Sequence, residues 1–340
     1  MRSSELDYDL PPELVAQHPV EPRDSSRLLV YDRASGECRH RMFADLPEEL
    51  DGELVVLNDT RVVLARLALR RASGGAVEVL LLERVDGDEW EALARPSRRL
   101  RAGERLVPSE HADPRRADNA CVEVTQALSD AARSGAVELV EELGEGRWRV
   151  RLDGEPHGRL PLPPYIHARL DDPERYQTVY GRASGSAAAP TAGLHFTPEL
   201  LARLDHERIT LHVGLDTFRP LTTELVEEHE LHGERYAVTP SAWARIESAE
   251  RVLAVGTTTT RVLETLARGA SLEGRTQLFV TPGFVFRRVD SLLTNFHLPR
   301  TTLLALVMAF AGIEETRRLY ALAISERYRF YSFGDAMLVL

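Results

Sequence analysis

The chain has 340 residues, of which 43% are hydrophobic and 28% are charged, and its formal net charge is −11. This composition is typical of a globular protein long enough for two domains, or for one large domain with an insertion. The N-terminus has no apolar core, and Cys38 and Cys121 are too far apart for a metal-binding pair, so we expect a cytoplasmic protein without a signal peptide, a disulfide framework or a bound metal.

The first part of the chain alternates short apolar runs with turns. The runs are rich in leucine and β-branched residues and are bounded by Asp, Gly or Asn, which is typical of strands. We predict strands at 28–31, 54–57 and 62–69.

The pattern changes between residue 70 and residue 152. Strand-like runs are separated by turns rich in Gly, Asp and Arg, and only 125–132 has a helical period. This pattern predicts an inserted all-β antiparallel domain over residues 70–152. Its predicted strands are 76–82, 90–94, 121–124, 137–142 and 148–152.

Arginines cluster within this predicted insert. All 42 basic residues of the chain are arginines, whose planar guanidinium groups bind phosphate in a bidentate way. Five of them lie between residues 95 and 105 with a single Glu104. A solvated loop is the simpler interpretation, and contact with a phosphate backbone is the alternative. The cluster consists of Arg95, Arg98, Arg99, Arg101 and Arg105.

Beyond a proline-rich connector at 156–164, helices and strands alternate. The predicted helices are 198–204, 240–250, 260–267, the run after Pro299 and 314–326, and the predicted strands are 209–213, 252–255 and 278–280. This alternation predicts an α/β main domain, residues 1–69 and 153–340, with a mixed sheet or barrel and surrounding helices.

Four polar segments lie at the predicted junctions of strands, turns and helices. They are Asn-Asp-Thr-Arg at 58–61, Pro-Thr-Ala-Gly-Leu-His-Phe-Thr-Pro at 190–198, His-Val-Gly-Leu-Asp-Thr-Phe-Arg-Pro at 212–220 and Val-Gly-Thr-Thr-Thr-Thr-Arg at 255–261. Ligands of open α/β folds bind at the carboxyl ends of strands. Taken singly, each segment is also compatible with a structural turn.

Two of these segments favour an anionic or charged ligand. Thr197 is suited to cap a helix that starts at Pro198, and the positive end of that helix favours a neutral His195 and a nearby anion. Gly256 and the threonines after it offer backbone N–H groups and hydroxyls to a charged small molecule, without the lysine and glycine spacing of a P-loop.

The segment 290–312 places polar side chains in front of an apolar helix. Thr301 or Thr302 is suited to cap this helix, and Gly312 to end it. Asn295 and His297 are two residues apart, so in an extended backbone they point the same way. A polar loop before a core helix is the equally weighted alternative. The apolar run is too short to span a membrane.

Taken together, these segments resemble the S-adenosylmethionine:tRNA ribosyltransferase-isomerase family of the queuosine pathway. The matching text spans nearly the whole chain in family order and includes RDSSRLLV (23–30), LNDTRV (57–62), APTAGLHFTP (189–198), LHVGLDTFRP (211–220), VGTTTTRVLE (255–264), LLTNFHLPRTTLL (292–304) and YRFYSFGDAML (328–338).

The resemblance implies an enzyme that uses S-adenosylmethionine as a ribosyl donor. Its product is an epoxycyclopentane attached to the 7-aminomethyl-7-deazaguanine at the tRNA wobble position, which is epoxyqueuosine-tRNA, and adenine and methionine leave. The implied partner is tRNA carrying the deazaguanine precursor. We expect no membrane partner and a monomer.

The chemistry of this reaction requires a base, a proton donor and groups that bind the substrate. The candidate acids and bases are His195, His297, Asp59, His212 and Asp335, with His195 and His297 ranked first because histidine titrates near neutral pH. The candidate substrate-binding residues are Arg61, Thr191, Gly193, Arg219, Gly256, Thr257, Thr258, Arg261, Thr294, Asn295 and Phe296, and the candidate tRNA-binding residues are the five arginines of the 95–105 cluster.

The chain departs from the family pattern at four positions. Asp216 stands in place of a glycine, Arg235 and Arg275 in place of tryptophans, and Gln277 in place of an aspartate. These changes leave two alternatives open. One is a diverged paralogue that acts on a free 7-deazapurine or another small amine, and the other is a catalytically silent RNA-binding relative.

Overall fold

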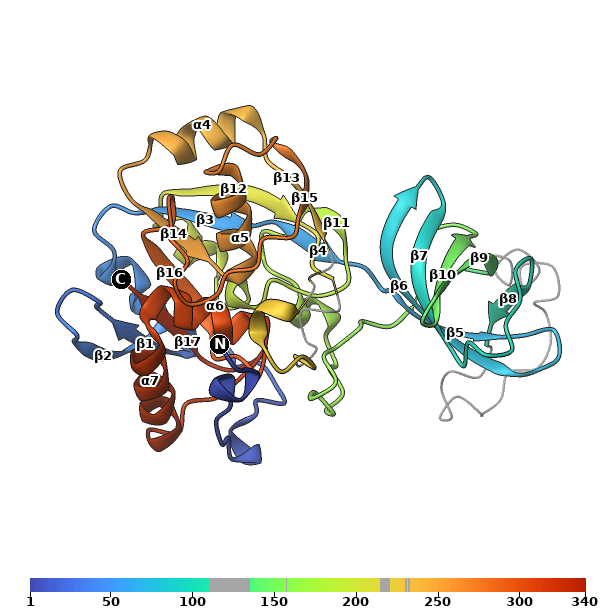
Figure 1. Cartoon of the computed structure of the whole chain (residues 1–340), viewed down its shortest axis with the longest axis horizontal. Coiled ribbons are helices and arrows are strands. Elements are labelled where there is room, and N and C mark those ends of the chain that lie inside the picture. Colours follow the sequence, from blue (N-terminus) through green and yellow to red (C-terminus); the bar gives the residue numbers. More distant parts are fainter. Residues whose placement is uncertain (110–134, 157, 215–220, 230, 232) are drawn as a thin grey trace. The chain divides into compact units, whose positions relative to one another are not determined.

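The computed structural model describes residues 1–109, 135–156, 158–214, 221–229, 231 and 233–340 (Figure 1). The chain divides into two compact units. Unit 1 contains Met1–Arg61, Leu162–Ser184 and Ala188–Leu340, and unit 2 contains Val62–Pro161 and Gly185–Ala187. No helix in the described part of the chain is long and apolar enough to cross a membrane.

Unit 1 is built on a nine-stranded mixed sheet with the order β15-β13-β12-β3-β14-β16-β17-β1-β2. The strands are β1 (Arg27–Tyr31), β2 (Cys38–Met42), β3 (Leu54–Asn58), β12 (His206–Leu211), β13 (Glu234–Ala237), β14 (Val252–Val255), β15 (Glu273–Thr276), β16 (Ser291–Asn295) and β17 (Ala336–Val339). The four neighbours β12, β3, β14 and β16 run parallel. Their carboxyl ends therefore meet at one edge of the sheet.

Strand β14 and residues 54–57 of β3 are entirely apolar because both faces of the sheet are covered. In β3, Leu54 and Val56 pack into one core, whereas Val55 and Leu57 pack into a second core on the opposite face. Such two-sided burial explains why these strands are continuous apolar runs and not alternating ones.

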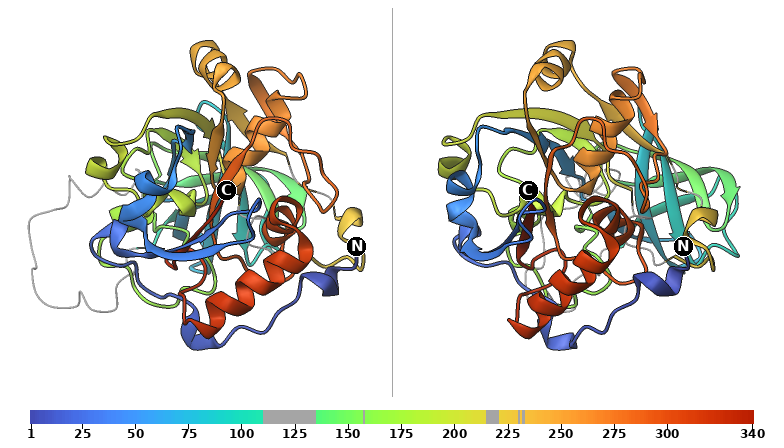
Figure 2. Two further views of the ribbon diagram at one scale, coloured as in Figure 1. Left: turned by 90° about the vertical axis from the view of Figure 1, so that its left-hand side faces the viewer. Right: turned by 60° about the vertical axis from the view of Figure 1, so that its left-hand side comes forward.

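Helices cover the sheet. They are α1 (Leu46–Glu49), α3 (Pro198–Leu201), α4 (Pro240–Ser248), α5 (Thr257–Leu266), α6 (Thr302–Ala311) and α7 (Ile313–Ser325). The side chain of Thr301 caps α6, and Gly312, with φ of 96°, ends it, as the sequence predicts. The N-terminal segment runs beside α7, where Arg317 donates to the carbonyl of Glu5 (Figure 2).

Unit 2 is a closed antiparallel barrel with the strand order β10-β7-β6-β5-β8-β9. Its strands are β5 (Arg66–Arg70), β6 (Ala76–Asp86), β7 (Glu89–Arg95), β8 (Arg105–Pro108), β9 (Val137–Gly144) and β10 (Arg147–Leu152). Alternate side chains fill its interior, including the buried Trp90 and Trp148. Two further strands, β4 (Thr60–Val62) and β11 (Ala183–Ser186), pair with each other.

The predicted mixed sheet with helices and the separate all-β part are both present, but several element predictions are wrong. The run 62–69 is interrupted at 63–65, and 278–280 is not a strand, since the strand here is β15. The predicted strand at 121–124 and helix at 125–132 lie outside the described residues. Unit 2 begins at Val62 and ends at Pro161, so it extends beyond the predicted insert at both ends.

Candidate active site

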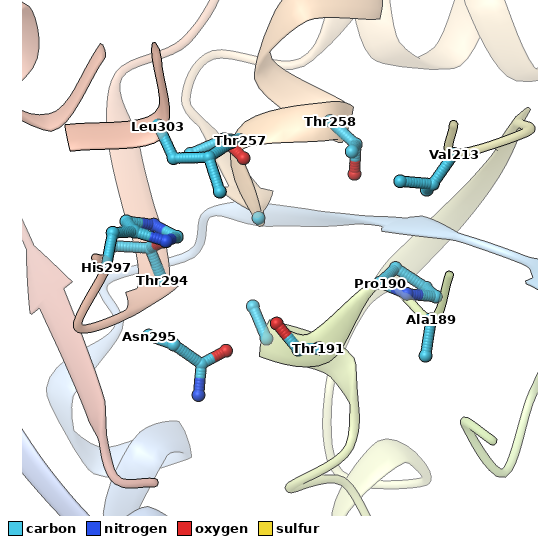
Figure 3. Close-up of a pocket in the computed structure, with 12 residues that line it drawn as sticks. Ala189, Pro190, Thr191, Val213, Thr257, Thr258, Thr294, Asn295, His297 and Leu303 are labelled. Carbon is cyan, nitrogen blue, oxygen red and sulfur yellow. The ribbon is translucent and has the colours of Figure 1, made fainter. Parts of the chain in front are cut away.

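A pocket in unit 1 lies where the parallel strands end. Val213 follows β12, Gly256 follows β14, and Thr294 and Asn295 are the last residues of β16. Ligands of α/β folds bind at this edge of a sheet. Figure 3 shows the lining, which consists of Ala189, Pro190, Thr191, Ala192, Val213, Gly256, Thr257, Thr258, Thr294, Asn295, His297 and Leu303.

The N-terminus of α5 forms one wall of this pocket. Gly256 has φ of 87°, a value that glycine adopts most readily, and no side chain caps the helix among the described residues. The hydroxyl of Thr259 donates to the carbonyl of Val255 and that of Thr260 to the carbonyl of Gly256. The hydroxyl oxygen of Thr258 lies 3.4 Å from the amide nitrogen of Asn58.

His297 and Thr294 form a second wall, beside Thr257 in Figure 3. His297 Nε2 lies 2.7 Å from the hydroxyl of Thr294, and in the described part of the chain Nδ1 has no hydrogen-bond partner. The hydroxyls of Tyr8 and Tyr320 hold the His297 backbone from behind, by donating to its carbonyl and accepting from its N–H. Burial lowers the pKa of His297 to about 3, so its imidazole is neutral near pH 7.

His195 lies behind the pocket and not in its lining. Its Nδ1 is 2.7 Å from the hydroxyl of Ser26, its Nε2 is 3.2 Å from Asn295 Nδ2, and its ring stacks on Phe43. Burial, with smaller effects of the positive Arg329 and Arg23, lowers the pKa of His195 to about 3. A neutral imidazole at this position agrees with the sequence-based expectation, although burial and not the helix dipole is the main cause.

The amide of Asn295 connects His195 to the pocket. Its Nδ2 donates to the carbonyl of Asp335 at 3.3 Å and to His195 Nε2 at 3.2 Å. Because Nε2 accepts, Nδ1 of His195 carries the proton and donates to Ser26. The Asn295 oxygen, Oδ1, is buried and has no hydrogen-bond partner in the described structure. In Figure 3 this oxygen points toward Thr191 across the pocket.

Gly193 fixes the segment that carries Thr191. A Cβ at Gly193 would lie 1.9 Å from the hydroxyl oxygen of Tyr180, so no larger residue fits unless that buried ring moves. Gly193 itself does not line the pocket. In this structure it allows close packing against Tyr180, and its predicted part in substrate binding stays a prediction.

Three candidate acids and bases lie away from the lining. Asp59 accepts from Thr210 at 2.6 Å, and His212 lies 3.0 Å from the hydroxyl of Thr60. The buried carboxylate of Asp335 accepts from the backbone N–H groups of Arg27 and Arg329. Burial raises the pKa of Asp335 against the opposing effect of these two bonds. Catalytic roles for the three residues stay predictions.

The predicted substrate-binding arginines have partners within the protein or fall outside the described residues. Arg61 pairs with Glu174 at 2.5 Å. Arg261 pairs with Glu234 and donates to the carbonyls of Thr276 and Leu278. Arg219 lies outside the described residues. Phe296, also predicted to bind substrate, is 0% exposed and packs in the aromatic core.

The arginine cluster lies in unit 2, where three of its members are on the surface. Arg98, Arg99 and Arg101 are exposed and, among the described residues, have no ion-pair partner. They line a groove together with Arg71, which pairs with Glu104 at 2.5 Å. Arg105 pairs with Asp153, and Arg95 is exposed on β7 opposite Glu78.

Comparison with known proteins places the chain in a family. A model of the family described as queuosine biosynthesis protein matches residues 3–339. The chain belongs to this family. The S-adenosylmethionine:tRNA ribosyltransferase-isomerase of Rubrobacter xylanophilus is 51% identical over 352 residues, which cover 100% of this chain and 98% of that protein. The protein of the same name from Symbiobacterium thermophilum is 50% identical, with 100% of both chains covered.

A solved structure extends the likeness to three dimensions. The crystal structure of S-adenosylmethionine tRNA ribosyltransferase from Thermotoga maritima is 35% identical in sequence, with a TM-score of 0.54. The match covers 99% of this chain and 100% of that one.

Arg235 and Arg275, the two arginines that we expect to stand in place of tryptophans, face each other in unit 1. Arg235 on β13 is directly opposite Arg275 on β15, and both line a surface groove with His212. Like charges in such cross-strand pairs are unfavourable unless an anion or a carboxylate lies near, and Glu273 lines the same groove. Asp216 lies outside the described residues.

Several lining residues of this family member were not predicted from the sequence. They are apolar and sit beside predicted polar residues: Ala189, Pro190, Ala192, Val213 and Leu303. Their positions within or next to the polar segments were the one feature of the sequence that indicated a place in the pocket lining. Within the described ranges, no group of three His, Cys, Asp or Glu residues is arranged to hold a metal ion.

Proposed function

We propose that this chain is an S-adenosylmethionine:tRNA ribosyltransferase-isomerase. It transfers and isomerises the ribosyl group of S-adenosylmethionine onto the 7-aminomethyl-7-deazaguanine at the tRNA wobble position, giving epoxyqueuosine-tRNA, adenine and methionine. The observation that carries this proposal is the full-length match to relatives of that name at 50% and 51% identity. The pocket at the ends of the parallel strands supports it, since its polar lining is shared with the quoted family segments.

Among the described lining residues, His297 is the one side chain with a basic nitrogen, so we propose it as the proton acceptor. The sulfonium of S-adenosylmethionine acidifies the adjacent ribose carbon, so the reaction requires a base near that carbon. The neutral His297 lines the pocket, and its Nδ1 has no hydrogen-bond partner among the described residues. This nitrogen can accept a proton when Nε2 carries the ring proton and donates to the Thr294 hydroxyl. His195 has both ring nitrogens occupied, so it acts through Asn295 as a positioning residue.

The exposed arginines of unit 2 are the proposed contact for the tRNA backbone. Arg98, Arg99 and Arg101 offer three guanidinium groups in one groove, a chemistry that suits phosphate. A local patch of this kind offsets the net charge of −11, which disfavours a polyanion. Docking of tRNA at this groove remains part of the proposal.

Release of adenine tests the proposed function. The protein is incubated with labelled S-adenosylmethionine and either tRNA bearing the deazaguanine precursor, the free 7-deazaguanine base, or neither. Adenine release that requires the modified tRNA supports the proposal. Release with the free base alone would indicate a diverged paralogue, and no release in any arm would indicate a silent RNA-binding relative.

A further inference from the structure

The first turn of α5 offers backbone donors to the pocket. Among the described residues no side chain caps this ten-residue helix, and Gly256 directs its own N–H to the carbonyl of Leu293. The N–H groups of Thr257 and Thr258 therefore stand at the positive end of the helix dipole. Both residues line the pocket and are at most 7% exposed. Such a helix start favours a negatively charged group.

The oxygen of Asn295 offers the complementary group. Oδ1 is a buried acceptor with no partner in the described structure, on a residue that is 2% exposed. The amide group cannot rotate by half a turn without losing two hydrogen bonds, because Nδ2 already donates to Asp335 and His195. An unpaired buried acceptor is costly, so its orientation into the pocket points to a ligand that donates an N–H or O–H.

We propose that the pocket binds the amino-acid end of S-adenosylmethionine as a zwitterion. The carboxylate lies at the N–H groups of Thr257 and Thr258, and the ammonium donates to Asn295 Oδ1. This inference rests on the proposed function, because it identifies which end of that substrate the pocket holds.

The charge of the lining agrees with this assignment. The residues that line the pocket are apolar, threonine, asparagine and the neutral His297, so no formal charge faces the ligand from the described lining. A zwitterion is neutral overall. Its carboxylate meets the positive end of the α5 dipole, and its ammonium meets the negative end of the Asn295 amide dipole. Arg261 forms an ion pair with Glu234 and is therefore not available to bind the carboxylate of the ligand. The N-terminus of α5 takes the place of an arginine as the partner of that carboxylate.

The test measures dissociation constants by calorimetry for S-adenosylmethionine, S-adenosylhomocysteine and two analogues of the latter. One analogue lacks the carboxylate, and the other lacks the amine. For the unmodified protein we expect loss of either group to weaken binding about 10- to 100-fold relative to S-adenosylhomocysteine. Equal affinity of all three thioethers would overturn the inference.

Two variants at one position assign the ammonium contact. Asn295→Leu is expected to weaken S-adenosylhomocysteine about tenfold or more and to leave the affinity for the amine-free analogue unchanged. Asn295→Asp keeps an acceptor and adds a charge but loses the Nδ2 donor to Asp335 and His195, so we expect a lower overall affinity with a stronger preference for ligands that carry the amine. An equal loss for both ligands in Asn295→Leu would contradict the assignment. Circular dichroism and thermal melting establish that each variant is folded.

The two proposals fail in distinguishable ways. If S-adenosylmethionine does not bind and no adenine is released, the proposed function is wrong. If it binds and reacts but neither end group affects the affinity of the thioethers, the function stands and the assignment of the pocket is wrong.

Discussion

Two buried histidines at the site differ in what they contact, and this difference separates their roles. His297 lines the pocket and its Nδ1 has no partner within the described part of the chain, whereas the two ring nitrogens of His195 contact Ser26 and Asn295. The sequence ranked the two together, because histidine titrates near neutral pH whatever its contacts. It could not indicate the Ser26–His195 contact, which joins residues 169 positions apart.

Substitution of the two histidines should therefore have different kinetic effects. We expect His297→Ala to slow single-turnover adenine release by about 10²–10⁴-fold, the usual contribution of a proton-transfer group. His195→Ala should mainly raise KM for S-adenosylmethionine, since it releases the Asn295 amide, and His195→Gln should partly restore it. A near-normal single-turnover rate for His297→Ala, or an unchanged KM for His195→Ala, would refute these roles.

The same two residues should make the fold sensitive to acid. Their pKa values are about 3 in the folded chain, against an ordinary value of 6.5, so between these values the unfolded chain binds more protons. Their contribution to stability is complete above pH 6.5 and is lost as the pH falls toward 3, by up to about 1.4 kcal/mol per pH unit for each histidine.

Urea unfolding at several pH values between 4.5 and 7 checks this expectation. Replacing either buried histidine by glutamine should flatten the dependence of the unfolding free energy on pH. The matched control is His167→Gln, which replaces an exposed histidine and removes none of these buried contacts. An identical slope in all three variants would contradict the argument.

At the scale of elements, one buried carboxylate on α5 holds this helix to the segment that leads into β16. Glu264 is 0% exposed, and its oxygens accept from the backbone N–H groups of Arg287, Arg288 and Val289 and from Arg268. The segment 287–289 leads into β16, which carries Thr294 and Asn295. Glu264 thereby fixes two walls of the pocket relative to each other.

Removal of this carboxylate should be strongly destabilising. Glu264→Ala leaves three backbone donors without their acceptor, and we expect a loss of about 3–5 kcal/mol in the free energy of unfolding. Glu314→Ala is the control. It also removes the carboxylate of a Glu–Arg pair within a helix, but the side chain of Glu314 is 83% exposed. It should cost less than about 1 kcal/mol. Denaturant titration of both variants measures the difference, and similar losses would count against the argument.

Elements were predictable where burial alone determines the pattern. The fully apolar runs of β3 and β14 and the caps at Thr197 and Thr301 follow from residue type and spacing. The run 278–280 misled because its apolar side chains pack on the core from an irregular segment, whose carbonyl at Leu278 accepts from Arg261. The strands β13 and β15 were not predicted because both are largely polar and exposed on one or both faces.

At the scale of the molecule, the two units have separate cores and separate proposed tasks. The barrel of unit 2 has its own apolar interior, and the exposed arginines lie on it. The change in sequence pattern at residue 70 indicated such a part, but its limits at Val62 and Pro161 depend on strand pairing and chain contacts that are distant in sequence.

Charge reversal should separate the two tasks. We expect the triple variant Arg98→Glu, Arg99→Glu, Arg101→Glu to raise KM for tRNA at least tenfold and to reduce its dependence on salt, because phosphate contacts release counterions. Affinity for S-adenosylmethionine should not change. A triple variant with unchanged tRNA kinetics would exclude this groove. The triple variant Arg169→Glu, Arg317→Glu, Arg318→Glu, at exposed positions of unit 1, makes the same change in net charge and is the control.

The order of strands in unit 1 also bears on how the chain is synthesised. β1, among the first elements made, lies between β2 and β17, and β17 ends at Val339. On the ribosome, β1 and β2 must therefore wait for residues 336–339 before they can join the sheet, whereas the barrel strands between residues 66 and 152 are complete much earlier. Unit 2 can form while unit 1 is still being translated, and the pocket is completed late.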